Sequence, residues 1–169
     1  MTPLAELARY NRWANAQVFA VCRAVDPDAL GAAAAGTIGT LEETLKHLAG
    51  VEDVYLAMLQ GRDLFAGQTD RKGFWLAYEA HDLEWFADRV AELDRGFEEL
   101  LASADDALLA GELRIPWFDF PMTRAQGVLQ ALTHSHTHRA QVLSTLGDRG
   151  VKVPEMDYVQ MLQQEHRGG

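Results

Sequence analysis

Two histidines one helical turn apart form the clearest chemical feature of this sequence. His134 and His138 lie in a stretch with helical periodicity, and at about 100° per residue their side chains point the same way. This spacing allows two imidazoles to bind the same metal ion, whereas His136 falls nearly opposite the pair and cannot join it on a regular helix. The pair alone is a weak indicator, because either histidine can also make a core hydrogen bond or lie on the surface.

A third histidine, His47, strengthens the prediction of a metal site. It lies at the edge of the apolar face of an earlier predicted helix, where an imidazole needs a polar partner such as a metal ion. Three histidines without a fourth protein ligand are typical of a catalytic site, since structural zinc is normally held by four protein ligands. Neutral imidazoles leave the charge of the ion uncompensated, so a bound water or thiol would be acidified. We therefore predict one divalent metal ion at His47, His134 and His138, with zinc, nickel, iron, copper and manganese all left open.

Four long amphipathic helices must position these histidines. Two of the helices begin with capping boxes, at Thr40 and Thr123, each followed three residues later by Glu or Gln. Between the third and fourth helices, residues 113–120 favour an extended connection or a short hairpin. The four predicted helices run from Pro3 to about Asp26, from Thr40 to Gly61, from Tyr78 to Ala102 and from Thr123 to Leu146, with Gly147 as the cap of the last one. A short final helix over 154–165 is expected to pack across one end of the bundle. The expected fold is an all-α bundle formed by residues 1–169 as one domain.

Composition disfavours several classes of partner. The formal charge is −10, with 25 acidic and 15 basic residues, and no basic run offers a surface for nucleic acid or anionic lipid. No apolar run approaches the roughly 18 residues needed to span a bilayer. The single cysteine, Cys22, and the lack of a recognisable signal peptide favour the cytoplasm.

Four passages, taken in order, resemble the DinB/YfiT-like family of metal-binding four-helix bundles. Together they cover nearly the whole chain. One departure is Ala140, where family members often carry glycine. The passages are Tyr10 to Asn15, Thr44 to Leu48 followed by Glu52, His134 to Gln141, and Leu146-Gly147 followed by Pro154 and Asp157-Tyr158.

The resemblance implies an up-down-down-up bundle, a metal ion held by His47, His134 and His138, and a homodimer. Related members include enzymes that join a low-molecular-weight thiol to an electrophile, and a mycothiol-dependent isomerase. The leading hypothesis is therefore a metal-dependent thiol S-transferase acting on a small-molecule substrate, with the thiol as co-substrate. A metal-dependent hydrolase and a non-catalytic metal-binding stress-response bundle stay open as alternatives. The absence of an acidic residue from the histidine motif disfavours the hydrolase, which usually needs a general base nearby.

Other residues whose side chains could take part in binding or catalysis have weaker support from the sequence. Arg139 and Gln141 match the family motif, either as groups that orient the ligands or as helix-packing residues. Glu52 lies five residues after His47, points elsewhere on a regular helix, and is a poor fourth ligand. The remaining candidates have simple structural interpretations: Cys22 as a small buried hydrophobe, Trp13 and Trp117 as core or pocket aromatics, and His81 and His166 as solvent-facing side chains.

Overall fold

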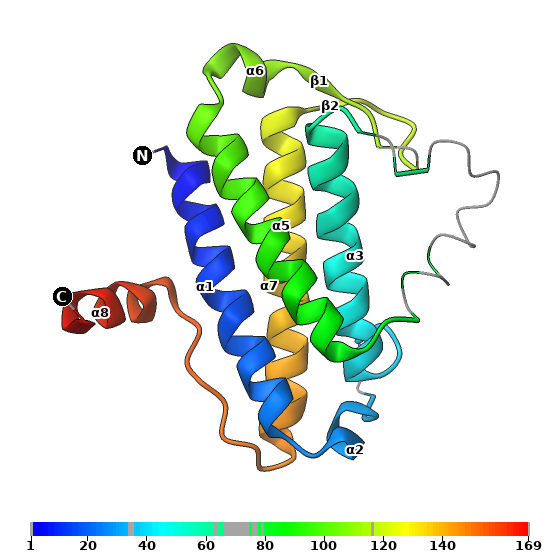
Figure 1. Ribbon diagram of the computed structural model, residues 1–169, viewed down its shortest axis with the longest axis vertical. Helices are drawn as coiled ribbons and strands as arrows, with labels where there is room; N and C mark the ends of the chain where they lie inside the picture. Colours follow the sequence, from blue (N-terminus) through cyan, green and yellow to red (C-terminus); the bar gives the residue numbers. More distant parts are fainter. Residues whose placement is uncertain are drawn as a thin grey trace.

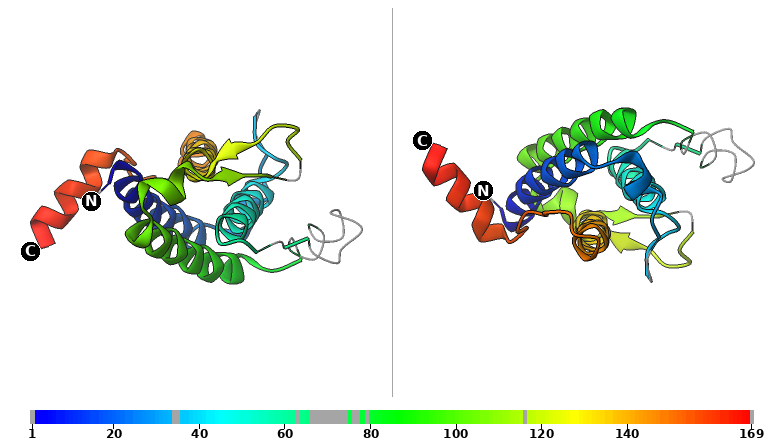
Figure 2. Two further views of the ribbon diagram at one scale, coloured as in Figure 1. Left: turned by 90° about the horizontal axis from the view of Figure 1, so that it is seen from above. Right: turned by 90° about the horizontal axis from the view of Figure 1, so that it is seen from below.

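The computed structural model describes residues 2–33, 36–62, 64–65, 75, 78, 80–115 and 117–168, and its centre is a bundle of four long helices (Figure 1). Helix α1 packs against α5 and α7, and α3 packs against the same two helices, so α1 and α3 occupy opposite corners. Figure 2 shows the four helices from each end of the bundle. The four helices are α1 (Pro3–Ala24), α3 (Leu41–Leu59), α5 (Leu83–Ser103) and α7 (Arg124–Asp148).

The helix directions follow the expected up-down-down-up pattern. In Figure 1, α1 and α7 run down the page, while α3 and α5 run up it. The chain between Gln60 and Asp82 must therefore join opposite ends of the bundle, and most of the stretch predicted to be irregular, 63–73, lies outside the described residues. This connection brings α3 and α5 together as parallel neighbours, which leaves α7 to pack antiparallel against α3.

Local side-chain chemistry sets most helix ends. Both predicted capping boxes are present, at Thr40 and at Thr123, and Asp26 caps a short helix, α2 (Pro27–Leu30). At two ends of the long helices, the predicted boundary was wrong for an identifiable physical reason. Helix α5 begins at Leu83 rather than Tyr78, because the Asp82 carboxylate accepts a hydrogen bond from the first turn. Helix α7 continues to Asp148, because the left-handed conformation that ends a helix lies at Gly150, where φ is +83°, and not at Gly147.

The predicted hairpin is present at the upper end of the bundle. A short helix, α6 (Asp106–Ala110), leads into β1 (Glu112–Leu113), which pairs antiparallel with β2 (Met122–Thr123). Gly127 allows β1 to lie close against α7, since a Cβ there would be 2.3 Å from a methyl carbon of Leu113. The glycine thus lets a strand approach the bundle.

The final helix, α8 (Tyr158–Gly168), is placed differently from the prediction. It starts later than expected and lies beside α1, pointing away from the bundle, instead of across one end (Figures 1 and 2). Met161 is its buried anchor, packed against Tyr10 and Ala14. Its charged and polar groups reach α1 as well, because Glu165 pairs with Arg9. No helix among the described residues is long and apolar enough to cross a membrane.

Besides the small cluster around Met161, the described residues form two larger apolar clusters, one toward each end of the bundle. Phe86, Leu45 and Leu146 belong to the lower cluster, and Phe97 and Leu132 belong to the upper one. Along each helix, a buried polar side chain lies between the two clusters. These side chains are Asn11 and Asn15 on α1, Glu52 on α3, Asp94 on α5 and Arg139 on α7. The bundle therefore has a polar middle layer to which every long helix contributes.

Candidate metal centre

The three histidines predicted as metal ligands lie together where α3 faces α7. One imidazole nitrogen from each histidine lies within 4.8 Å of those from the other two. The Nε2 atom of His134 lies 3.2 Å from Nε2 of His47 and 3.1 Å from Nε2 of His138. The two histidines of α7 are neighbours through helical spacing, whereas His47 is brought to them by the antiparallel packing of α3 on α7.

The donor atoms fit a divalent ion. Two nitrogen ligands of a tetrahedral zinc ion, each about 2.05 Å from the metal, are about 3.3 Å apart, close to the two separations given above. The tautomer of His138 agrees with this geometry. The Gln141 amide nitrogen donates to the carbonyl of Gly36, which turns its oxygen toward Nδ1 of His138 at 2.7 Å. His138 therefore carries its proton on Nδ1, and the lone pair of Nε2 is directed at the other two histidines.

Burial keeps the three imidazoles neutral. It lowers the pKa of His47 to about 4, with a further contribution from His138. It lowers the pKa of His134 to about 3, with both other histidines adding to the effect. Burial also lowers the pKa of His138, against the opposing effect of its hydrogen bond to Gln141. Unprotonated nitrogens are the form that metal ions require, so the site is ready for an ion at neutral pH.

The described residues supply no fourth metal ligand. No further His, Cys, Asp or Glu in the described part of the chain joins the three histidines. Glu52 is fully buried in the polar middle layer, so the expectation that it is not a ligand agrees with its position. Of the two motif residues left open, Gln141 contacts His138, and Arg139 turns into the polar layer.

The polar layer lies behind the metal centre, one residue along α7 from His138. Arg139 donates to the side-chain oxygens of Asn11 and Asn15 at 2.5 and 2.6 Å. Both asparagines donate in turn to Glu52 and Asp94, with distances of 2.9–3.4 Å. Burial raises the pKa of both carboxyl groups, and the charge of Glu52 raises that of Asp94 further, while Arg139 opposes the rise at both. The layer thus contains one buried cation, two acidic groups and two amides that connect them.

A cavity of about 620 Å³ opens beside the metal centre. His47 and His134 form one end of it, and Tyr55 and Gln130 lie farther along the same two helices. Trp117 is one of its walls, as one of the two interpretations of that residue predicted. A volume of this size is typical of sites for small molecules.

The remaining sequence candidates have structural roles or lie on the surface. Cys22 is 2% exposed in the lower apolar cluster, and burial raises its pKa to about 12, which makes it a poor nucleophile. Trp13 does not line the cavity and donates instead to Gln164 on α8. His81 and His166 are exposed, as predicted.

Sequence reasoning missed two groups of residues at this site. The asparagines of the polar layer, Asn11 and Asn15, were quoted only as part of the family resemblance. Their spacing of one helical turn among apolar neighbours was the available signal. Gln130 was missed as well, although it lies one turn before His134 and therefore on the same face.

Comparison with known proteins gives the family of the chain. The profile of the DinB family matches residues 1–168. A solved structure of a DinB-like protein from Bacillus subtilis, YjoA, is similar, with a TM-score of 0.64 at 14% identity, covering 92% of this chain and 99% of that one. At 14% identity, the similarity to this structure concerns the fold alone. A separate comparison with curated proteins found no match. Because the family profile spans nearly the entire sequence, the chain belongs to the DinB family.

Proposed function

We propose that this protein is a metal-dependent enzyme that transfers a low-molecular-weight thiol to an electrophilic small molecule. The observation that carries the proposal is the convergence of three neutral histidines, without a fourth protein ligand among the described residues, beside a cavity of about 620 Å³. Such an arrangement leaves coordination positions for exchangeable ligands. The choice of a thiol follows from the resemblance to thiol-dependent members of the family.

In the proposed reaction, some residues of the chain would bind the ion and others would orient the residues that bind it. His47, His134 and His138 would hold the ion, and Gln141 fixes the tautomer and orientation of His138. A divalent ion at this place supplies Lewis acidity, which favours the thiolate form of a thiol. The cavity beside the histidines positions the electrophile. In the reaction, a sulfur–carbon bond forms, the bond from that carbon to its leaving group breaks, and the thiol proton passes to solvent.

Hydrolysis is the weaker alternative for this site. The described residues that line the cavity include neither Asp nor Glu, so no carboxylate is placed there to act as a general base on water. The two nearby acidic groups of the polar layer, Glu52 and Asp94, are buried and engaged with the asparagines.

Metal content of the purified, tag-free protein tests the ligand set. We expect about one ion per chain in the wild type and loss of that ion in each of the variants His47→Ala, His134→Ala and His138→Ala. His136→Ala is the matched control, because His136 lies on the same helix but is exposed and outside the site. Retention of the ion in the three ligand variants, or its loss in the control, would contradict the assignment.

Thiol chemistry is tested next, in cobalt-substituted protein. A thiol that reaches the ion changes the visible spectrum, and a metal-binding protein without turnover would show neither this change nor a reaction rate. We expect a saturable spectral change with low-molecular-weight thiols, followed by transfer to electrophiles at rates above buffer. No rate with any thiol and electrophile pair would refute the transferase. The homodimer and the cytoplasmic location expected from the sequence stay predictions.

A further inference from the structure

Two lines of side chains, one on each of the facing helices, form the floor of the cavity beside the metal centre. On α3 the line consists of His47, Val51 and Tyr55, spaced four residues apart. On α7 it consists of Gln130 and His134, with the same spacing. Because the helices are antiparallel, both lines lead away from the histidines in the same direction. The floor therefore changes from the histidines at one end to Val51, Tyr55 and the amide of Gln130 at the other.

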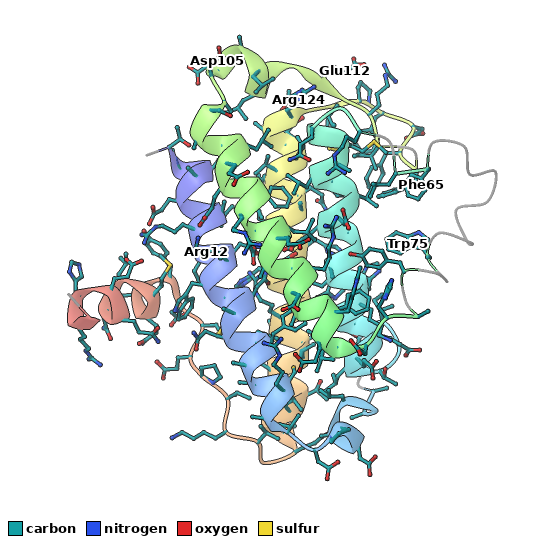
Figure 3. The ribbon with its side chains drawn as sticks, in the orientation of Figure 1. Arg12, Phe65, Trp75, Asp105, Glu112 and Arg124 are labelled. Carbon is teal, nitrogen blue, oxygen red and sulfur yellow. The ribbon has the colours of Figure 1, made fainter. Side chains whose placement is uncertain are left out.

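Aromatic rings form the walls. Trp75 lies near His47, with a distance of 6.4 Å between ring centroids, and Figure 3 shows it beside α3. Gly50 allows this position, since a Cβ there would be 2.3 Å from the indole ring of Trp75. At the far end, Trp117 meets Tyr55 edge-on at 6.4 Å and is followed along the chain by Phe118. Three elements far apart in sequence thus bring four aromatic side chains to one cavity.

The described residues lining the cavity include no carboxylate, ammonium or guanidinium group, because none of them is Asp, Glu, Lys or Arg. Burial raises the pKa of Tyr55 to about 12, so its phenol stays neutral. Gln130 adds an amide with one acceptor and two donor hydrogens, which is a group suited to orienting a neutral polar substituent. Away from the three histidines, a charged ligand would lose its hydration without gaining a charged partner among these side chains.

We propose that this cavity binds a flat, uncharged aromatic group, held between the rings of Trp75 and Trp117 and oriented by Gln130. That this group belongs to the electrophilic substrate rests on the proposed function, while the binding itself does not. Aromatic rings prefer offset or edge-on aromatic partners, and four of the described residues that line the cavity are Trp, Tyr or Phe. The bound group would lie beside the three histidines, with its reactive carbon toward the metal centre.

Calorimetric titration of the metal-free protein tests the binding without requiring any activity. The probes are 2-naphthol, its saturated analogue decahydro-2-naphthol, and the charged naphthalene-2-sulfonate. We expect saturable binding of one 2-naphthol per chain. The other two probes should bind at least about tenfold more weakly. Trp117→Ala should weaken 2-naphthol binding by up to about tenfold, whereas Phe120→Ala should not change it. Phe120 is the matched control because it lies in the same hairpin and is 52% exposed, outside the cavity lining.

Two results would overturn the inference: sulfonate binding as tight as that of 2-naphthol, or 2-naphthol binding that is absent or insensitive to Trp117→Ala. Circular dichroism of the variant ensures that a loss of binding is not a loss of fold. The failure of the proposed function is recognised separately. Binding of 2-naphthol without any thiol transfer would refute the transferase but leave the aromatic site standing. Thiol transfer to small aliphatic electrophiles without 2-naphthol binding would refute the aromatic site but leave the transferase standing.

Discussion

Replacing Arg139 by methionine should destabilise the protein severely, since its charge lies in the middle of the bundle. The side chain of Arg139 is 3% exposed and donates to both Asn11 and Asn15. The variant would leave two amide oxygens without their donor, and two buried acidic groups, Glu52 and Asp94, without a cation. Removing one partner of a buried ionic network costs about 3–5 kcal/mol. For a domain of this length that corresponds to a fall in Tm of about 6–20 °C.

Urea unfolding of the metal-free protein measures this cost. Arg12→Met is the matched control, because Arg12 is also an arginine that pairs with a carboxylate, Glu98 at 2.7 Å, but its side chain is 56% exposed. That exposed pair should contribute about 0–1 kcal/mol. If Arg139→Met costs no more than Arg12→Met, the polar layer does not depend on its cation, and the reasoning is refuted.

The destabilisation caused by Arg139→Met should depend on pH. Burial raises the pKa of Glu52 and Asp94 above their values in the unfolded chain, so the folded state binds more protons and is favoured as pH falls. Arg139 opposes this rise, and its removal should strengthen it. The cost of Arg139→Met should therefore be smaller at about pH 5.5 than at about pH 8. A cost that grows toward acid pH would show that the carboxyl groups are not the origin of the destabilisation.

Three further predictions concern the ligand histidines and the glycines of α7. As pH falls from about 6.5 toward about 4, the metal-free wild type should lose more stability, measured as the urea midpoint, than its His134→Ala variant. The unfolded imidazole of His134 takes up a proton that the buried one, with a pKa of about 3, does not, whereas Glu52 and Asp94 contribute equally to both proteins. Equal pH profiles of the two proteins would contradict it. Gln141→Leu should weaken zinc binding about 10–100-fold in a chelator competition, while the exposed Gln163→Leu leaves it unchanged. Gly127→Ala should destabilise by about 1–3 kcal/mol in urea unfolding, because its Cβ would meet Leu113 at 2.3 Å. Gly147→Ala, with its nearest neighbour at 3.7 Å, should be neutral or stabilising, and equal effects of the two glycine variants would refute the close approach of β1.

The helices could be predicted because their signals are local. Thr40 and Thr123 make the capping boxes expected from their neighbours, and of the two alternatives for residues 113–120 the hairpin is present, with its paired strands at the two ends of that stretch. The start of α5 was harder to predict, since Asp82 and Tyr78 are both compatible with a helical pattern and only the capping hydrogen bond decides between them. Helix α8 was misplaced because Met161 is its anchor, and no local feature tells which surface a single buried methionine will contact.

The candidate site could be predicted only in part, because only some of its residues give a local signal in the sequence. The pair on α7 is visible as a spacing, and His47 is visible as a polar residue at the edge of an apolar face. The cavity depends on how α3, α7 and two loop segments meet, which is a property of long-range packing. Trp75 illustrates the limit, since its position on α3 depends on Gly50, and the two residues are joined only in the folded chain.

The separation of the ligands along the chain has a consequence for biosynthesis. His47 and His134 are 87 positions apart, and the approach of their helices requires α7 to be docked. During translation, therefore, the nascent chain can offer His47 alone, and later the pair on α7, before it can offer all three histidines. An ion held by all three histidines would therefore bind only after α7 has docked on α3. Metallation would then act as a final maturation step that distinguishes finished chains from incomplete ones.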